Sequence, residues 1–255
     1  MKILITGKSG YIATSFAAYT KHEAHQISVR GTAWRDISFA GYDAVLHTAG
    51  LVHVRETKEN RYDYFAINRD LAFDVAKKAK AEGLKQFVFL SSISVYGLQR
   101  GHITADTPTV PTSNYGRSKL AAEALLTGLA DDSFRVAVLR PPMVCGPGCP
   151  GNYAKLCKLV KTVPYFPDYK NARSLVSIET LCGQLESIVS VKESGLFFPC
   201  DPISISTAQM AVDIAKSQGK TLRLTRIFNL PISLMMPYVS VLSKLFGSLT
   251  IDASL

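Results

Sequence analysis

The sequence predicts an α/β protein with a doubly wound parallel sheet and a small C-terminal cap. Three observations predict this fold. Over the first 140 residues, short apolar runs alternate with longer helical patterns, as in a parallel sheet covered by helices. A glycine-rich turn directly follows the first apolar run. A second turn-rich stretch begins at Pro141 and marks the point where the chain leaves the sheet.

The strands of the sheet are predicted at five short runs, several of them continuously apolar, as expected for strands buried on both faces. Helical patterns connect these runs, and the second helix is expected to end near Gly83, because glycine readily ends a helix. The expected strands are Lys2–Thr6, His25–Arg30, Ala44–Thr48, Gln86–Ser91 and Arg135–Arg140, and the expected helices are Tyr11–Lys21, Tyr62–Ala81 and Ser113–Leu129.

The stretch PPMVCGPGCPGN after residue 140 cannot continue a helix and is expected to begin a substrate-side segment. The chain then returns to the core through Leu175–Ser177, a helix near Glu179–Ser190 and an apolar strand at Leu196–Phe198. We therefore expect a core from residues 1–142 and about 174–200, and a substrate-binding cap from residues 143–173 and 201–255.

The 255 residues are 47% hydrophobic, enough for a sizeable core, and carry 29 Lys and Arg against 20 Asp and Glu. The resulting charge of +9 suits an anionic partner. The basic residues form no block, and the group Lys77, Lys78 and Lys80 fits a solvated helix face, so nucleic acid is not an expected partner.

Five cysteines without a Cys-x-x-Cys pair indicate neither a disulfide framework nor a zinc site, and no metal site is predicted. The N-terminal apolar run is too short for the core of a signal peptide, so a cytoplasmic protein with reduced thiols is expected.

Residues 227–243, IFNLPISLMMPYVSVLS, carry no charge, but their 17 residues are at the short limit for a membrane span, and Pro231 and Pro237 interrupt them. A cap helix that covers a pocket is the preferred interpretation, with no transmembrane span. The alternative is an interfacial contact with a membrane, or with a partner, through residues 227–246, where Lys244 would serve as an anchor.

The run KILITGKSGYIA places Gly7, Gly10 and Ala13 between a strand and a helix. In a dinucleotide-binding turn the first glycine permits the tight bend, the second lets the pyrophosphate approach, and a small third residue lets helix and strand pack. The anion then lies on the N–H groups that begin the helix. The position of this motif at the first strand predicts a Rossmann-like core that binds NAD or NADP.

Arg30 ends the second predicted strand, where an acidic residue would usually hold the ribose of NAD and an arginine accommodates the phosphate of NADP. Arg30 therefore favours NADP, with Arg35 as a possible helper. A surface arginine that stacks on the adenine is the equal alternative. Asp36 is a candidate for a hydrogen bond with the adenine amine, or for a residue that only caps a turn.

Tyr115 and Lys119 in NYGRSK lie four residues apart, so on a helix they share a face. A free tyrosine has a pKa near ~10 and is a poor base at neutral pH. A neighbouring cation favours the phenolate, so Lys119 is expected to lower the pKa of Tyr115 toward neutrality. The spacing alone also arises by chance, and its value depends on the rest of the site.

The chain resembles an extended short-chain dehydrogenase/reductase of the NAD-dependent epimerase/dehydratase family, whose best known members act on nucleotide sugars. The resemblance extends over the first 150 residues and continues into the cap at residues 171–181. The matching segments are TGKSGYIA near the start, HTAG at 47–50, YFAIN ending at Asn68, FLSSISVYG at 89–97, NYGRSK at 114–119, LRPPMVCGPG at 139–148 and NARSLVSIETL at 171–181.

This resemblance implies that Tyr115 is the acid and base, that Lys119 also reaches the nicotinamide ribose, and that Ser92 orients the substrate oxygen. Asn68 would steady Lys119 or a water, although a surface position on its helix is the alternative. The implied cofactor-binding residues are Gly7, Ser9, Gly10, Tyr11, Ile12, Arg30, Asp36, Ile37, Ala49, Gly50, Asn68, Tyr115, Lys119 and Pro142; the implied substrate-binding residues are Ser92, Ser94, Asn152 and Arg173.

Two residues depart from the family pattern: Met143 replaces a common Asn, and Cys145 replaces the Tyr of a Tyr-Gly-Pro motif. The differences obscure the substrate more than the class of reaction. The first hypothesis is an epimerase at C4 of a UDP-hexose or UDP-N-acetylhexosamine that acts through a 4-keto intermediate. The alternatives are an NADPH-dependent 4-keto nucleotide-sugar reductase and a non-catalytic NADP-binding regulator. A homodimer through helices 62–81 and 113–129 is a further expectation from the family.

Overall fold

A computed structural model describes all 255 residues, Met1–Leu255, and the chain divides into two compact units. The first unit comprises Met1–Gly97, Pro108–Pro142 and Ile178–Pro199. The second comprises Leu98–Thr107, Met143–Ser177 and Cys200–Leu255. Each unit has its own hydrophobic core.

The first unit is built on a parallel sheet of six strands in the order β10-β6-β4-β3-β1-β2. β2 and β3, which are consecutive along the chain, lie on opposite sides of β1, so the direction of the crossovers reverses there. The strands are β1 (Lys2–Thr6), β2 (Glu23–Ile27), β3 (Ala44–His47), β4 (Gln86–Leu90), β6 (Arg135–Leu139) and β10 (Gly195–Phe197).

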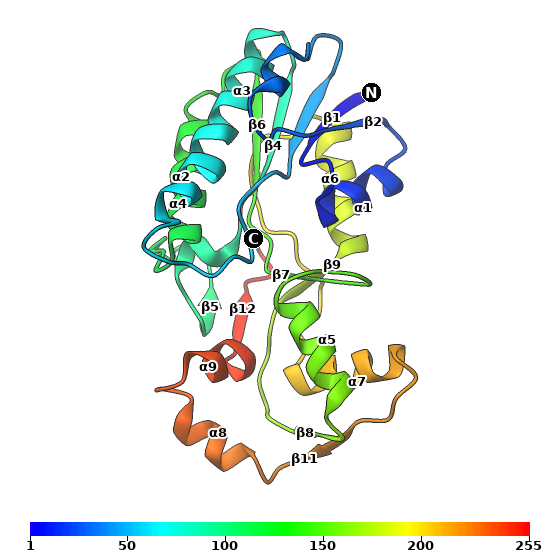
Figure 1. The fold of residues 1–255 in the computed structure, drawn as a ribbon, viewed down its shortest axis with the longest axis vertical. Helices are drawn as coiled ribbons and strands as arrows, with labels where there is room; N and C mark the ends of the chain where they lie inside the picture. The colour runs from blue at the N-terminus through cyan, green and yellow to red at the C-terminus, as the bar shows by residue number, and fades with distance from the viewer. The chain divides into compact units, whose positions relative to one another are not determined.

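Helices cover both faces of this sheet (Figure 1). One face carries α1 (Tyr11–Tyr19) and α6 (Ile178–Ser190), which pack on each other. The other carries α2 (Arg61–Phe65), α3 (Leu71–Ala81) and α4 (Asn114–Thr127). Every residue of β3 and β4 is buried, and all of them except His47 and Gln86 are apolar, as expected for strands covered on both faces. The predicted doubly wound α/β fold is thus confirmed.

Two predicted elements of the first unit, the second strand and the second helix, differ from the structure. β2 ends at Ile27, not at Arg30, because its only partner is β1, whose Thr6 pairs with Ile27 as the last residue of the ladder. The long second helix is interrupted by a π-helical turn, Ala66–Asp70, between α2 and α3. A π-turn of this kind often marks a functional site.

The second unit contains three short two-stranded sheets and four helices. Leu156 and Val160 of one helix and Met210 and Ile214 of another belong to its core. The elements are β5 (Gly101–Ile103), β7 (Met143–Cys145), α5 (Asn152–Thr162), β8 (Tyr165–Pro167), β9 (Leu175–Ser177), α7 (Thr207–Ser217), β11 (Arg223–Thr225), α8 (Asn229–Met235), α9 (Ser240–Phe246) and β12 (Leu249–Ile251), with the 3₁₀ turns Ala33–Asp36 and Ile93–Tyr96 in the first unit.

The uncharged segment at 227–243 does not form the single cap helix that its composition predicts. α8 ends at Met235, two residues before Pro237, and α9 begins at Ser240. Proline lacks the N–H group that would continue the helix, so Pro237 separates the two pieces. Pro231 is tolerated because it lies in the first turn of α8, where N–H groups have no partner within the helix.

Candidate active site

The candidate site lies at the carboxyl edge of the six-stranded sheet. Residues from four of the predicted motifs come together there, each just after the end of a strand. β1, β3, β4 and β6 are neighbours in one parallel sheet, so the residues that follow them emerge at the same edge. Gly7 follows β1, Ala49 and Gly50 follow β3 closely, Ser92 follows β4, and Pro142 follows β6. In open sheets of this kind ligands bind outside the carboxyl ends of the strands.

The glycine turn has the geometry that its sequence predicts. Gly7 has a φ of +102°, and a Cβ there would lie 2.7 Å from the Thr48 hydroxyl oxygen. The N–H of Gly7 donates to the carbonyl of Ile27 at the end of β2. α1 then begins without a side-chain cap at Gly10 and without an acidic residue in its first turn. These features leave the beginning of α1 suited to an anion such as a pyrophosphate.

Gly50, Asn68 and Lys119 meet at one point of this edge. A Cβ on Gly50 would lie 3.0 Å from Asn68 Oδ1 and 3.5 Å from Lys119 Nζ. Asn68 is fully buried on the π-helical turn; its side chain accepts from the N–H of Leu51 at 2.7 Å and donates to the Ser118 hydroxyl at 3.0 Å. The surface alternative for Asn68 is therefore wrong. Its hydrogen bonds fix the Gly50–Leu51 backbone beside Lys119.

Tyr115 and Ser92 form a side-chain pair across the site. Burial raises the pKa of Tyr115 to about 12, and a hydrogen bond with the Ser92 side chain opposes this shift. Ser92 also donates to the Ser94 hydroxyl at 3.0 Å, so the three predicted side chains are linked. In the chain alone, burial is the largest cause of this raised pKa, and the charge of Tyr64 acts in the same direction. The lowering of the pKa of Tyr115 by Lys119 stays a prediction.

Lys119 is held away from water on the inner side of α4. It is 5% exposed, and its ammonium donates to the carbonyl of Leu90 at 2.7 Å and lies 4.5 Å from the centre of the Phe89 ring. Burial lowers the pKa of Lys119 to about 7, against the charge of Glu123. A group with this pKa exchanges a proton at neutral pH, as a participant in proton transfer must.

The beginning of α4 is fixed in two ways, and both position Tyr115. Ser113 caps the helix and accepts from the N–H of Gly116 at 3.0 Å. The Glu56 carboxylate accepts from the N–H groups of Asn114 at 3.0 Å and Tyr115 at 3.1 Å. An acidic group is favourable at a helix N-terminus. Sequence reasoning missed Glu56, since it lies in an irregular loop 58 residues before Asn114.

Gly116 allows α4 to approach the loop that carries Ser92. A Cβ at this position would lie 2.4 Å from the carbonyl oxygen of Ser94, which no real contact tolerates. We expect Gly116→Ala to lower stability by about 1–3 kcal/mol through overpacking. Because the Ser92–Tyr115 distance would grow, turnover should also fall, by up to about 10²-fold for a shift near 1 Å.

Gly128→Ala is the matched control for Gly116→Ala, since it lies just after the same helix and a Cβ there meets nothing closer than 3.5 Å. Thermal unfolding and turnover of both variants check the prediction. Equal behaviour of the two variants would contradict it.

A buried network of four side chains lies behind the site and was not predicted. Glu123 and Arg140 form a salt bridge of 2.6 Å with side chains only 8% and 10% exposed. Ser91 donates to Glu123, and Arg140 Nη1 donates to the Tyr96 hydroxyl at 2.7 Å. Glu123 follows Lys119 by one helical turn, and this spacing was the signal that could have identified it.

His47 is a second buried group outside the predicted set. Its ring lies between Phe87 and Phe89 and hydrogen-bonds through Nδ1 with the Thr6 hydroxyl at 2.8 Å. Burial, and then the charge of Lys119, lower the pKa of His47 to about 3. The histidine is therefore neutral at physiological pH.

The depressed pKa of His47 predicts an acid-dependent loss of stability. Between pH 6.5 and 3 the unfolded chain binds a proton on His47 that the folded chain does not, so stability falls as pH is lowered through this range. The expected slope is about 1.4 kcal/mol per pH unit once the pH is well below 6.5. Urea unfolding over this pH range checks the prediction. The free energy of unfolding should depend less steeply on pH in His47→Gln than in wild type, whereas the exposed control His25→Gln should behave as wild type does.

The structure does not bring every predicted residue into this cluster. Arg30, Asp36 and Ile37 are exposed residues that follow β2. Arg30 has no acidic partner, whereas Arg35 pairs with Asp74 at 3.0 Å. Among the other predicted cofactor residues, Ser9, Tyr11 and Ile12 form the glycine turn and the first turn of α1, and Pro142 is buried.

The two predicted substrate residues outside the sheet, Asn152 and Arg173, belong to the second unit. Asn152 is exposed at the beginning of α5. Arg173 is half-buried and donates from Nη1 to the carbonyl of Gly247 at 2.7 Å, and burial lowers its pKa. Their roles toward a substrate stay predictions.

Residues 3–176 match the model of the NAD dependent epimerase/dehydratase family. The chain belongs to this family. It is 29% identical to a UDP-glucose 4-epimerase of Vibrio cholerae, with 96% of this chain and 82% of that protein aligned. It is also 29% identical to a UDP-glucose 4-epimerase of Bacillus subtilis, but that match covers 55% of this chain and only 52% of the relative.

Solved structures agree with the family at the level of the fold. The dTDP-4-dehydrorhamnose reductase of Bacillus anthracis in complex with NADP superposes with a TM-score of 0.72 at 17% identity, over 88% of this chain and 82% of that one. As a member of the NAD dependent epimerase/dehydratase family, the chain is an enzyme that uses a nicotinamide cofactor. The open glycine turn, the uncapped α1 and the crowding around Gly50 fit such a group.

Proposed function

We propose that this enzyme is an NAD(P)-dependent epimerase that inverts C4 of a UDP-hexose or UDP-N-acetylhexosamine through a 4-keto intermediate. The observation that supports it most is the pairing of the Tyr115 phenol with the Ser92 hydroxyl, on the same face of α4 as Lys119. The UDP-glucose 4-epimerases among its relatives support the choice of substrate class.

In this proposal the chain itself manages one proton. In its phenolate form, which the positive charge of a bound nicotinamide would favour, Tyr115 takes the proton of the sugar 4-hydroxyl as C4 is oxidised. It returns the same proton to the oxygen when the ketone is reduced on its other face. Ser92 donates a hydrogen bond to that oxygen in both states. A bound nicotinamide supplies the hydride acceptor and donor. Atoms therefore balance, with no net oxidation of the sugar.

Lys119 and the glycine turn would hold the cofactor. The Lys119 ammonium lies beside Gly50 and Asn68, where it can contact a ribose hydroxyl, and the beginning of α1 would bind the pyrophosphate. Ala49, Gly50 and Pro142 would border the cofactor along the carboxyl edge. Residues of the second unit, Asn152 and Arg173 among them, would contact the nucleotide and sugar.

The second candidate is a 4-keto nucleotide-sugar reductase that uses NADPH, and two observations favour it. No acidic residue occurs between Glu23 and Asp36, where NAD-binding proteins usually place one, while Arg30 is exposed and has no acidic partner. With a pKa of about 12, Tyr115 is also protonated at neutral pH, the form that donates a proton to a carbonyl oxygen.

The identity and turnover of the bound nucleotide distinguish the candidates. The purified enzyme is denatured, any released nucleotide is identified, and the native enzyme is given UDP-glucose, UDP-galactose and their N-acetyl forms without added cofactor. Retained NAD with interconversion of epimers supports the epimerase. Consumption of added NADPH with a 4-keto sugar nucleotide, and no epimer formation, would replace it with the reductase. Failure of both reactions would overturn both proposed activities.

A further inference from the structure

The helical pair α8 and α9 in the second unit presents large apolar side chains to solvent. Figure 1 shows α8 following β11 and α9 leading back to β12. Five side chains on this segment are between 65% and 88% exposed, and we call them the α8–α9 apolar surface: Ile227, Leu230, Leu234, Tyr238 and Val241.

The residues of the α8–α9 apolar surface are not core residues, because other apolar residues of the same segment already pack in the core. Ile232 on α8 and Met236, which directly follows the helix, are each 7% exposed and pack in the core of the second unit. Leu230 and Leu234, one turn apart, are on the outer side of the same helix. When a helix is apolar on both sides, each side is expected to be buried against another surface.

The charges around the surface have one sign. Between Asp213 and Asp252 the sequence contains no acidic residue and five basic ones: Lys216, Lys220, Arg223, Arg226 and Lys244. Lys220 is occupied by the carbonyls that end α5, and Arg226 pairs with Asp168 at 3.0 Å while staying largely exposed. Arg223 and Lys244 are exposed and have no acidic partner. The whole second unit has 11 Lys and Arg against 5 Asp and no Glu.

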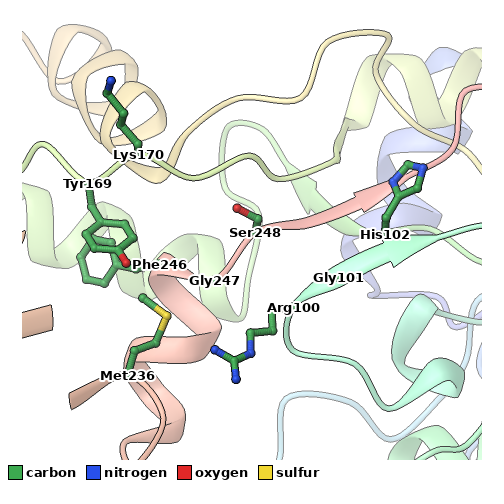
Figure 2. Close-up of a pocket in the computed structure, with 9 residues that line it drawn as sticks. All are labelled: Arg100, Gly101, His102, Tyr169, Lys170, Met236, Phe246, Gly247 and Ser248. Carbon is green, nitrogen blue, oxygen red and sulfur yellow. The ribbon is translucent and has the colours of Figure 1, made fainter. Parts of the chain in front are cut away.

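A groove adjoins this surface within the second unit and adds two more cations. Its volume is about 570 Å³, and it is lined by Met236 after α8, Phe246 at the end of α9, Arg100 and Lys170, among others. Figure 2 shows Tyr169, Phe246 and Met236 gathered on one side, with the guanidinium of Arg100 directed toward Met236. The groove thus places apolar and cationic groups side by side.

We propose that the α8–α9 apolar surface docks this enzyme on an anionic lipid bilayer. The five apolar side chains would enter the boundary between head groups and acyl chains, and Arg223, Arg226 and Lys244 would lie among the lipid phosphates. Each basic residue near such a surface strengthens the attraction to anionic lipids. The contact is interfacial, since no helix of the protein is long and apolar enough to cross a membrane.

Charge complementarity favours a membrane over a second copy of this chain. A two-fold interface would place the same patch on both subunits, and this patch has cations without nearby acidic residues, apart from Asp168. Like charges opposed across an interface are unfavourable. Anionic phosphates supply the charge that a second copy lacks.

Sedimentation of the full-length protein with vesicles tests the proposal. With equal parts of phosphatidylglycerol and phosphatidylcholine, we expect binding at low salt that weakens as salt is added, and about tenfold less binding to phosphatidylcholine alone. The triple variant Ile227→Ser, Leu230→Ser, Leu234→Ser should bind the anionic vesicles at least about tenfold less, because the buried apolar area is lost.

Matched variants on other surfaces make the test specific. Val110→Ser, Val191→Ser, Ile203→Ser removes three exposed apolar residues elsewhere and should bind as wild type does. Arg223→Ser, Arg226→Ser, Lys244→Ser should lose the preference for anionic vesicles, whereas Arg61→Ser, Lys77→Ser, Lys85→Ser should retain it. Circular dichroism confirms that each variant is folded.

Two results would overturn the proposal. One is equal binding of wild type and the α8–α9 triple variant, including no binding by either. The other is a wild-type dimer that becomes a monomer in the triple variant without any vesicle binding, which would assign the surface to a second copy. Neither result depends on which sugar nucleotide the enzyme uses.

Discussion

Replacing Tyr115 with Phe is expected to reduce turnover by about 10²- to 10⁴-fold, the usual contribution of a positioned acid or base. The variant loses only the hydroxyl that pairs with Ser92, and the ring keeps its place on α4. Ser92 keeps its hydrogen bond with Ser94, so the variant should lose no more than about 1–3 kcal/mol of stability. Thermal unfolding then shows that the variant is folded and that the loss of activity is not a loss of structure. The reaction measured is whichever of the two proposed reactions the wild type performs.

Tyr62→Phe is the matched control for Tyr115→Phe, since Tyr62 is a largely exposed tyrosine in the same unit. It should leave turnover and unfolding unchanged. The nucleotide content of Tyr115→Phe, measured after denaturation, should equal that of wild type. A general acid or base contributes at least about 10²-fold to the rate. If Tyr115→Phe keeps more than about a tenth of the wild-type rate, another group moves the proton.

Removing Glu123 should produce the largest loss of stability of any single change considered. Glu123→Ala leaves the Arg140 guanidinium buried without its carboxylate, and breaking a buried pair in this way typically costs about 3–5 kcal/mol. Ser91 and Arg140 both lose an acceptor in the same variant. Denaturant unfolding, with the midpoint and slope compared with wild type, measures the loss.

Two controls separate the buried charge from the volume of the side chain. Arg35→Ala breaks the exposed pair with Asp74 and should cost no more than about 1 kcal/mol. The double variant Glu123→Leu, Arg140→Met removes both charges and should recover much of the stability that Glu123→Ala loses. A loss below about 1 kcal/mol for Glu123→Ala would show that the pair behaves as a surface pair.

The parts of the fold that the sequence predicts are those encoded locally. β3 and β4 are short, fully buried strands, and the glycine turn between β1 and α1 is a contiguous motif. Once the strands are parallel neighbours, Gly7, Ser92 and Pro142 must emerge at one edge, so the position of the candidate site follows. The division into two domains, the roles of the site residues and the homodimer stay predictions.

The parts that sequence reasoning missed depend on contacts between distant residues. Arg140 and Glu123 are 17 residues apart, and nothing in either segment indicates that they meet. The raised pKa of Tyr115 is caused chiefly by burial, a property of the whole fold that the spacing of Tyr115 and Lys119 does not reveal. The break between α8 and α9 at Pro237 could have been predicted from the sequence, since proline cannot continue a helix.

The π-helical turn at Ala66–Asp70 limits how this segment can change in length. The N–H of Leu71 bonds to the carbonyl of Ala66, so this turn contains one residue more than an α-helical turn would. Deleting one residue here would give a regular helix, yet it would rotate either Asn68 or the residues of α3 by about 100°. Val75, Ala76 and Ala79 on α3 are buried in the core. Loss of one residue here would therefore either turn the Asn68 side chain away from Gly50 or turn these three core residues toward water.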